Sequence, residues 1–148
     1  SLTEFSPLNK CTRAEAVTFL WRAAGSPEPK STSCAFTDVE VGSYYYKAVL
    51  WAVENKITDG VSDTLFNPTG IVSRAQVVTF LYRTANASAV SANNPFSDVK
   101  SDMYYTDAVL WAVANKITDG TSTTTFSPDN NCDRGQIVTF LYRYFDAK

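Results

Sequence analysis

The chain has 148 residues, a common length for a single domain, and its 45% hydrophobic and 19% charged residues are typical of a folded globular protein. A net charge of −2 argues against a nucleic-acid partner, because such proteins usually carry a surplus of basic residues. No histidine is present, so the commonest general base and metal ligand is missing. The apolar runs are too short to span a bilayer, and we therefore expect no membrane insertion.

The dominant feature is an internal repeat of about 60 residues. The segment from Phe36 to Gly60 recurs as Phe96 to Gly120, with Phe-x-Asp-Val at its start, Ala-Val-Leu-Trp-Ala-Val in the middle and Ile-Thr-Asp-Gly at its end. A second block, Phe-x-Pro followed by an arginine and a Val-Thr-Phe-Leu-(Trp/Tyr)-Arg run, occurs three times. Its first arginines are Arg13, Arg74 and Arg134.

Each full repeat is predicted to form two helices joined by a loop. The first runs from about Tyr44 to Asn55, where apolar residues recur at helical spacing. The second begins at Ser73, which forms a capping box with Gln76. The equivalent pairs in the other copies are Thr12 with Glu15 and Asp133 with Gln136. We expect Trp51 and Trp111 to be core residues.

These patterns divide the chain into five segments. They are the second half of a first repeat (1–25), a linker (26–35), a second repeat (36–85), a linker (86–95) and a third repeat (96–146). Because the first copy has only its second half, we expect an upstream segment or another chain to complete it. Association with another chain would cover apolar surface that the unfilled position leaves exposed.

Three cysteines permit at most one disulfide within the chain, and Cys11 with Cys34 is the pair to test. No CxxC spacing for zinc occurs. Asp59 and Asp63 flank Gly60, but the spacing is not that of an EF-hand and Asp63 is replaced by threonine in the next copy. We predict no metal and no cofactor.

The order of these motifs resembles the S-layer homology (SLH) domain family over nearly the whole chain, and residues 12–15 reproduce its Thr-Arg-Ala-Glu element. The resemblance implies an all-α, pseudo-threefold bundle with projecting prongs. It also implies an extracellular, non-catalytic module that anchors proteins to the bacterial cell surface. Its partner would be secondary cell-wall polysaccharide, often bearing an acidic pyruvyl ketal, held in grooves between neighbouring copies.

Carried over residue by residue, the resemblance assigns ligand contact to the arginine of the capping turn, the aromatic that opens the first helix, the aspartate of Phe-x-Asp-Val and the loop glycine. These are Arg13, Arg74, Arg134, Tyr44, Tyr104, Asp38, Asp98, Gly60 and Gly120. The chain departs from the family pattern at several of the surrounding positions. Glutamine stands for glutamate at Gln76 and Gln136, glycine for alanine at Gly135, and lysine for the helix-ending glycine at Lys56 and Lys116.

Two further expectations concern local structure. Because lysine replaces glycine after the first helix, we expect Asn55 and Asn115 to adopt the left-handed cap conformation. The arginines stand in the first turn of a helix, where unpaired N–H groups and the dipole favour an anion. Arginine adds a planar fork suited to a carboxylate.

Each of these assignments has an alternative in which the residue has only a structural role. The arginines could pair with Asp38 or Asp98 and only hold the fold, and the two aspartates could simply form turns. Tyr44 and Tyr104 could be sugar platforms or packing residues. We expect the groove of Arg13 to lack a partner, because its copy is incomplete.

The alternative function is a structural or self-assembly module that uses the same fold. An enzyme is the third class, but no nucleophile elbow, phosphate loop or histidine triad is present, and only scattered carboxylates remain for glycoside chemistry.

Overall fold

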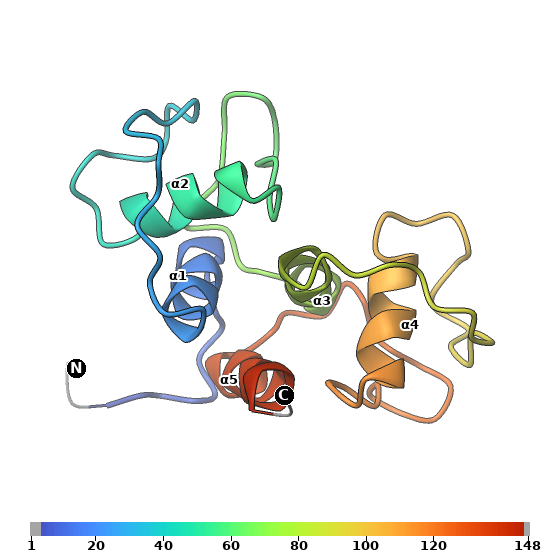
Figure 1. The fold of residues 1–148 in the computed structure, drawn as a ribbon. Coiled ribbons are helices and arrows are strands. Elements are labelled where there is room, and N and C mark those ends of the chain that lie inside the picture. Colours follow the sequence, from blue (N-terminus) through green and yellow to red (C-terminus); the bar gives the residue numbers. More distant parts are fainter. Residues whose placement is uncertain (1–3, 147–148) are drawn as a thin grey trace.

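The computed structural model describes residues 4–146 and confirms the all-α class (Figure 1). Its helices, with their bounds, are α1 (Arg13–Ala23), α2 (Tyr46–Glu54), α3 (Arg74–Thr84), α4 (Thr106–Ala114) and α5 (Arg134–Phe145). The only strand-like pairing in this range consists of isolated β-bridges.

The three helices that follow the Phe-x-Pro loops form the centre of the molecule. Helices α1, α3 and α5 contact one another pairwise, whereas α2 packs on α1 and α4 packs mainly on α3 (Figure 1). Trp111 of α4 also contacts Tyr144 of α5, with ring centroids 5.9 Å apart. The leucines at equivalent positions, Leu20, Leu81 and Leu141, are buried between the central helices. Helices α2 and α4, called the prong helices here, therefore each pack on the central helix of the preceding copy.

All three central helices begin with the predicted capping box. In α3 the Ser73 hydroxyl accepts from the Gln76 N–H at 3.2 Å, and the Gln76 Oε1 accepts from the Ser73 N–H at 3.1 Å. The same reciprocal bonds close α1 and α5. These bonds satisfy backbone donors that the first turn would otherwise leave open.

A closed ring of backbone hydrogen bonds joins the residues just before the three helices. The Cys11 N–H donates to the Cys132 carbonyl at 3.1 Å, the Cys132 N–H to Val72 at 2.9 Å, and the Val72 N–H to Cys11 at 2.9 Å. All three residues are fully buried. Cys11, Cys34 and Cys132 are free thiols, so the Cys11–Cys34 disulfide is not formed. Burial raises the pKa of both the Cys11 and the Cys132 thiol to about 12.

The prong helices differ from the prediction at both ends. The first of them starts at Tyr46, and Tyr44 lies before it, edge-on to Tyr45. The expectation that Asn55 takes the left-handed cap conformation is wrong, because its φ is −90°. Lys56 adopts that conformation instead, with a φ of 56°. The same holds for Asn115 and Lys116.

The Asn55 side chain has a different role in the helix end. Its Nδ2 donates to the Trp51 carbonyl at 2.8 Å, which also accepts from the Asn55 backbone N–H at 3.1 Å. The side chain therefore adds a second hydrogen bond at the helix end. Trp51 and Trp111 are buried, as predicted.

Candidate functional site

The first arginine of each copy lies between two phenylalanine rings. The Arg13 guanidinium carbon is 4.9 Å from the centroid of Phe66 and 5.8 Å from that of Phe80. Its Nε donates to the Phe66 carbonyl at 2.8 Å. The Phe-x-Pro loop of one copy therefore holds the arginine of the preceding copy, through a cation–π contact and a hydrogen bond.

The other two arginines repeat this geometry around the bundle. Arg74 lies between Phe126 and Phe140 and donates to the Phe126 carbonyl at 3.0 Å. Arg134 lies between Phe5 and Phe19 and donates to the Phe5 carbonyl at 2.9 Å. The last arginine thus meets the first loop, and the arrangement closes on itself.

Arg13 and Arg74 are buried cations with unused donors. Each is only 4% exposed, and burial lowers the pKa of each guanidinium from its ordinary value. The Nη2 atom of each has no hydrogen-bond partner among the described residues. A buried charged donor without a partner is costly, so both sites favour an incoming acceptor.

Arg134 has a partner that the other two lack. Its Nη1 lies 2.6 Å from the Glu15 Oε1, and the two side chains are 22% and 25% exposed. Glutamines 76 and 136 occupy the position of Glu15 in the other copies.

The aspartates of Phe-x-Asp-Val shape the loop. The Asp38 carboxylate accepts from the backbone N–H of Phe66 at 2.9 Å and of Asn67 at 2.7 Å. Asp98 does the same for Phe126 and Ser127. The alternative in which Arg13 pairs with Asp38 is wrong, because no ion pair joins the two within residues 4–146. The Arg13 Nε donates instead to the carbonyl of Phe66, a residue that Asp38 holds through its N–H.

The helix starts do not offer free backbone donors, which corrects the expectation of an anion site there. The Arg13 N–H donates to the Gly70 carbonyl at 2.8 Å, and the Ala14 N–H donates to Pro68 at 3.0 Å. At the starts of α3 and α5, carbonyls of the neighbouring loops accept hydrogen bonds from the first two backbone N–H groups in the same way. Any anion site in this region therefore depends on side chains.

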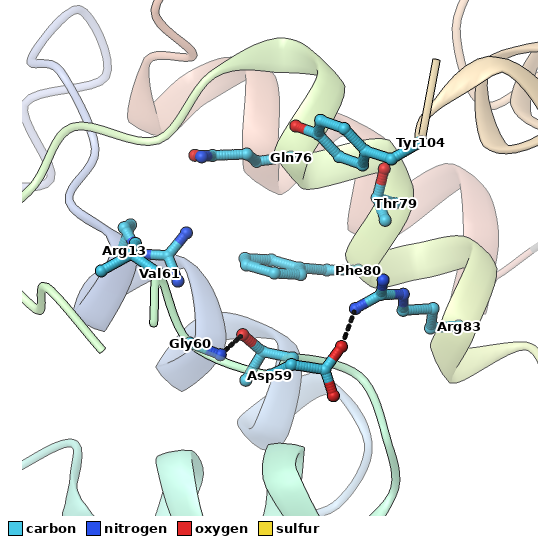
Figure 2. Close-up of a pocket in the computed structure, with 10 residues that line it drawn as sticks. Arg13, Asp59, Gly60, Val61, Gln76, Thr79, Phe80, Arg83 and Tyr104 are labelled. Carbon is cyan, nitrogen blue, oxygen red and sulfur yellow. Dashed lines mark hydrogen bonds and ion pairs between the residues drawn. The ribbon is translucent and has the colours of Figure 1, made fainter. Parts of the chain in front are cut away.

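A cavity of about 350 Å³, here named the Arg13 groove, opens beside the first arginine (Figure 2). Its lining residues include Arg13, Gly60, Gln76, Arg83 and Tyr104. They come from all three copies, so the expectation that this groove lacks a partner is wrong. Burial raises the pKa of the Tyr104 hydroxyl, and the charges of Arg13 and Arg83 act in the opposite direction.

A second cavity of about 430 Å³, the Arg74 groove, lies one copy further on. It is lined by Arg74, Gly120, Gln136 and Arg143, among others, and none of its lining residues is a counterpart of Tyr104.

Tyr44 lines neither of these two grooves. Burial and the charge of the neighbouring Glu15 raise the pKa of the Tyr44 hydroxyl. Glu15 belongs to the Arg134 site, defined here as Arg134, Glu15, Phe5 and Phe19.

The loop glycines line the two grooves but are also required by packing. Gly60 has a φ of +82°, and a Cβ atom there would lie 2.5 Å from the Phe36 ring and 2.6 Å from the Leu65 carbonyl oxygen. Gly120 is similarly confined against Phe96. Only glycine fits either position.

Two arginines that line the grooves, Arg83 and Arg143, are not among the residues predicted from the sequence. Arg83 donates to the Ile57 carbonyl at 3.2 Å and lies 3.3 Å from an Asp59 oxygen (Figure 2). Arg143 donates to Ile117 at 3.2 Å. The signal was present, since the same arginine ends the Val-Thr-Phe-Leu run in every copy.

Within residues 4–146 there is no group of three or more histidine, cysteine, aspartate or glutamate side chains placed to hold a metal ion. None of the helices described in that range is long and apolar enough to cross a membrane.

Comparison with known proteins gives one family and several relatives. The model of the S-layer homology domain matches residues 35–78 and 95–138. An endoglucanase of Bacillus sp. (strain KSM-635) is 30% identical over 84% of this chain and 13% of its own length. The surface-layer 125 kDa protein of Lysinibacillus sphaericus is 31% identical over 74% of this chain and 9% of its own length. A cell surface protein of Thermoanaerobacter kivui is 28% identical over 76% and 16%, respectively.

Proposed function

Because the chain belongs to the S-layer homology domain family, we propose that it binds secondary cell-wall polysaccharide, through an acidic group of the saccharide, in the Arg13 and Arg74 grooves. Family membership makes the chain a module that anchors proteins at the cell surface. It spans only 9% to 16% of the length of the relatives that it matches, so it corresponds to a small part of each. The proposal assigns the module no catalytic role.

One observation carries the proposal: the unpartnered Nη2 atoms of Arg13 and Arg74 lie in buried side chains that line open cavities. A carboxylate such as that of a pyruvyl ketal would enter these cavities and pair with the guanidinium groups, whose Nη2 atoms are themselves enclosed. Hydrogen bonds to charged groups contribute roughly 1.5–3 kcal/mol each. Arg83 would supply a second cation in the Arg13 groove.

The sugar ring would rest on Tyr104 in the Arg13 groove. This side chain is 62% exposed, which leaves its face open to a pyranose, while its hydroxyl can bond to ring substituents. The Arg74 groove has no such aromatic in its lining, so we expect it to bind more weakly. Two grooves on one chain strengthen retention on a repeating polymer through avidity.

The test is retention of the chain on purified wall polysaccharide, before and after mild acid removes its pyruvyl ketals. We expect retention to fall when the ketals are removed. The double variant R13M/R74M keeps an unbranched apolar side chain at each position but loses both guanidinium groups, and its affinity should fall at least about tenfold. The matched control is R22M, on the exposed last turn of α1. A folded R13M/R74M chain that binds the polymer as tightly as the unmodified chain contradicts the proposal.

The outer face of α5 favours a second function, association with a further helix. Val138 and Tyr142 are 40% and 66% exposed there, whereas α4 covers their equivalents Val78 and Tyr82 on α3. A cavity of about 330 Å³ lies beside them. We propose that this face takes a helix of the same apolar chemistry as α4, supplied from outside the described residues.

A labelled peptide with the sequence of residues 103–116 tests this association by fluorescence anisotropy. It should bind the chain, and binding should be lost with Y142E or when the peptide carries W111A. Absence of peptide binding, with a strict monomer by light scattering, excludes this second function.

A further inference from the structure

The third residue of each central helix forms part of the capping box and commits one atom of its head group there. The Glu15 Oε2 accepts from the Thr12 N–H at 2.9 Å. The Gln76 Oε1 accepts from the Ser73 N–H at 3.1 Å, and Gln136 makes the same bond in α5. Since a backbone N–H needs an acceptor, these bonds identify the oxygen of each glutamine.

The remaining atom of each head group differs between the copies. In Glu15 it is a second carboxylate oxygen, and the Arg134 Nη1 donates to it at 2.6 Å. In Gln76 and Gln136 it is an amide nitrogen, which donates and cannot accept. These two glutamines line the grooves of Arg13 and Arg74. Within residues 4–146 no ion pair reaches Arg13 or Arg74, in contrast to Arg134.

We propose that this third residue decides which arginine accepts a ligand anion: Gln76 and Gln136 keep Arg13 and Arg74 open and add an N–H donor, whereas Glu15 occupies Arg134. The inference rests on the proposed function in one respect, that the natural anion is the acidic group of the wall saccharide. It deepens that function by predicting that the Arg13 and Arg74 grooves bind the anion. At the Arg134 site, the charge of Glu15 already neutralises the arginine.

The expected selectivity follows from charge. An incoming carboxylate at Arg134 must displace Glu15 or lie beside another anion, and both outcomes cost free energy. At Arg13 the same carboxylate meets a buried cation and, on our assignment, an amide donor with no competing carboxylate on that residue. Asp59 is the acid that lines this groove, and one of its oxygens already lies 3.3 Å from the Arg83 Nη1.

The chain supplies its own controls for exchanging these residues. Glutamate completes the capping box of α1, and glutamine completes those of α3 and α5. Both bonds of the box are present in every case. At positions 15 and 76, where the N-cap is a hydroxyl residue, the exchange preserves the helix start and changes the charge and the atom that faces the arginine. At position 136 the N-cap is Asp133, so glutamate there also adds a like charge to the capping box. Thermal unfolding of each variant checks that the fold is retained.

The experiment follows the assigned arginine Nε–Hε signals by NMR during titration with pyruvate and with a synthetic methyl hexopyranoside bearing a pyruvyl ketal. In the unmodified chain the signals of Arg13 and Arg74 should shift, and that of Arg134 should not. Q76E should weaken binding at Arg13 roughly tenfold to hundredfold, and Q136E should do so at Arg74. E15Q should make Arg134 respond.

The possible outcomes separate this inference from the proposed function. A chain that binds wall polysaccharide, but whose Arg13 response to pyruvate survives Q76E unchanged or whose Arg134 responds without E15Q, overturns the inference alone. Arginines that respond in the predicted pattern, on a chain that wall polysaccharide does not retain, support the inference and contradict the proposed function. No response of any arginine to either probe overturns the inference.

Discussion

Helices α3 and α5 have nearly the same sequence and different surroundings. Val78 is fully buried beneath α4, and its equivalent Val138 is 40% exposed. Phe66 is fully buried over Arg13, and its equivalent Phe5 is 45% exposed over Arg134. The difference shows that a repeated residue type does not fix its own burial, because the neighbouring element provides the cover. Substitutions at equivalent positions should therefore have unequal effects, and they test this comparison directly.

The largest contrast is expected at the thiols. Cys11 and Cys132 lie in the backbone ring, where the copies do not differ, and both should resist alkylation in the folded chain while the half-buried Cys34 reacts. The pKa of each ring thiol is raised from 9.0 to about 12, so the unfolded chain loses these protons first as the pH rises. The stability that they contribute is complete below pH 9.0 and is lost between 9.0 and about 12.

Thiol counting with and without denaturant measures the resistance to alkylation. Unfolding experiments at several alkaline pH values measure the loss of stability. Three thiols that react at one rate in the folded chain would contradict the fully buried ring.

The next largest effect should come from the phenylalanines that cover the arginines. F66A should lower the free energy of unfolding by about 3–5 kcal/mol, because it leaves a cavity beside a buried cation. F5A should cost less than about 1 kcal/mol, since the ring is already partly exposed. Urea unfolding of the two variants, side by side, gives the difference. Equal losses would mean that Phe5 is covered in solution.

A smaller effect is expected at the valines that face the prongs. V78A removes fully buried methyl groups beneath α4 and should cost about 1.5–2.5 kcal/mol. V138A should stay within about 0.5 kcal/mol on the bare face of α5. The same unfolding experiment, repeated with the 103–116 peptide present, sharpens the comparison, because a bound helix should make V138A more costly.

The smallest effect should be the same in both prongs. Lys56 and Lys116 have the left-handed conformation, which is unfavourable for a residue with a Cβ atom. K56G and K116G should each stabilise the chain by about 0.5–1 kcal/mol. Thermal unfolding measures the gain. A loss in either variant would show that the lysine side chain makes a contact that outweighs its backbone strain.

Local structure was largely predictable from the sequence. The three capping boxes were predicted because their pattern, a hydroxyl or carboxylate followed three residues later by glutamate or glutamine, is complete within one turn. The position of the left-handed residue was not predicted. Asparagine is the better left-handed residue by its own preference, but the prong geometry requires that conformation one residue later, at Lys56.

The composition of the Arg13 groove could not be predicted from the sequence, because the residues that line it are distant in the chain. Arg13, Gly60 and Tyr104 belong to three different copies and meet only when the bundle forms. The repeat identified each of them but could not show which copy contributes to which groove. The closed helix starts escaped prediction for the same reason, since carbonyls such as that of Gly70 come from a neighbouring loop.

The ring formed by Cys11, Val72 and Cys132 sets the number of copies. In a linear solenoid, terminal units can be removed one at a time, because each unit contacts only its neighbours. Here the deletion of one copy frees one N–H and one carbonyl of the ring, so the axis is left with an unpaired donor and an unpaired acceptor. A two-copy truncation should therefore not fold as a smaller version of the same molecule, and a fourth copy has no place to insert.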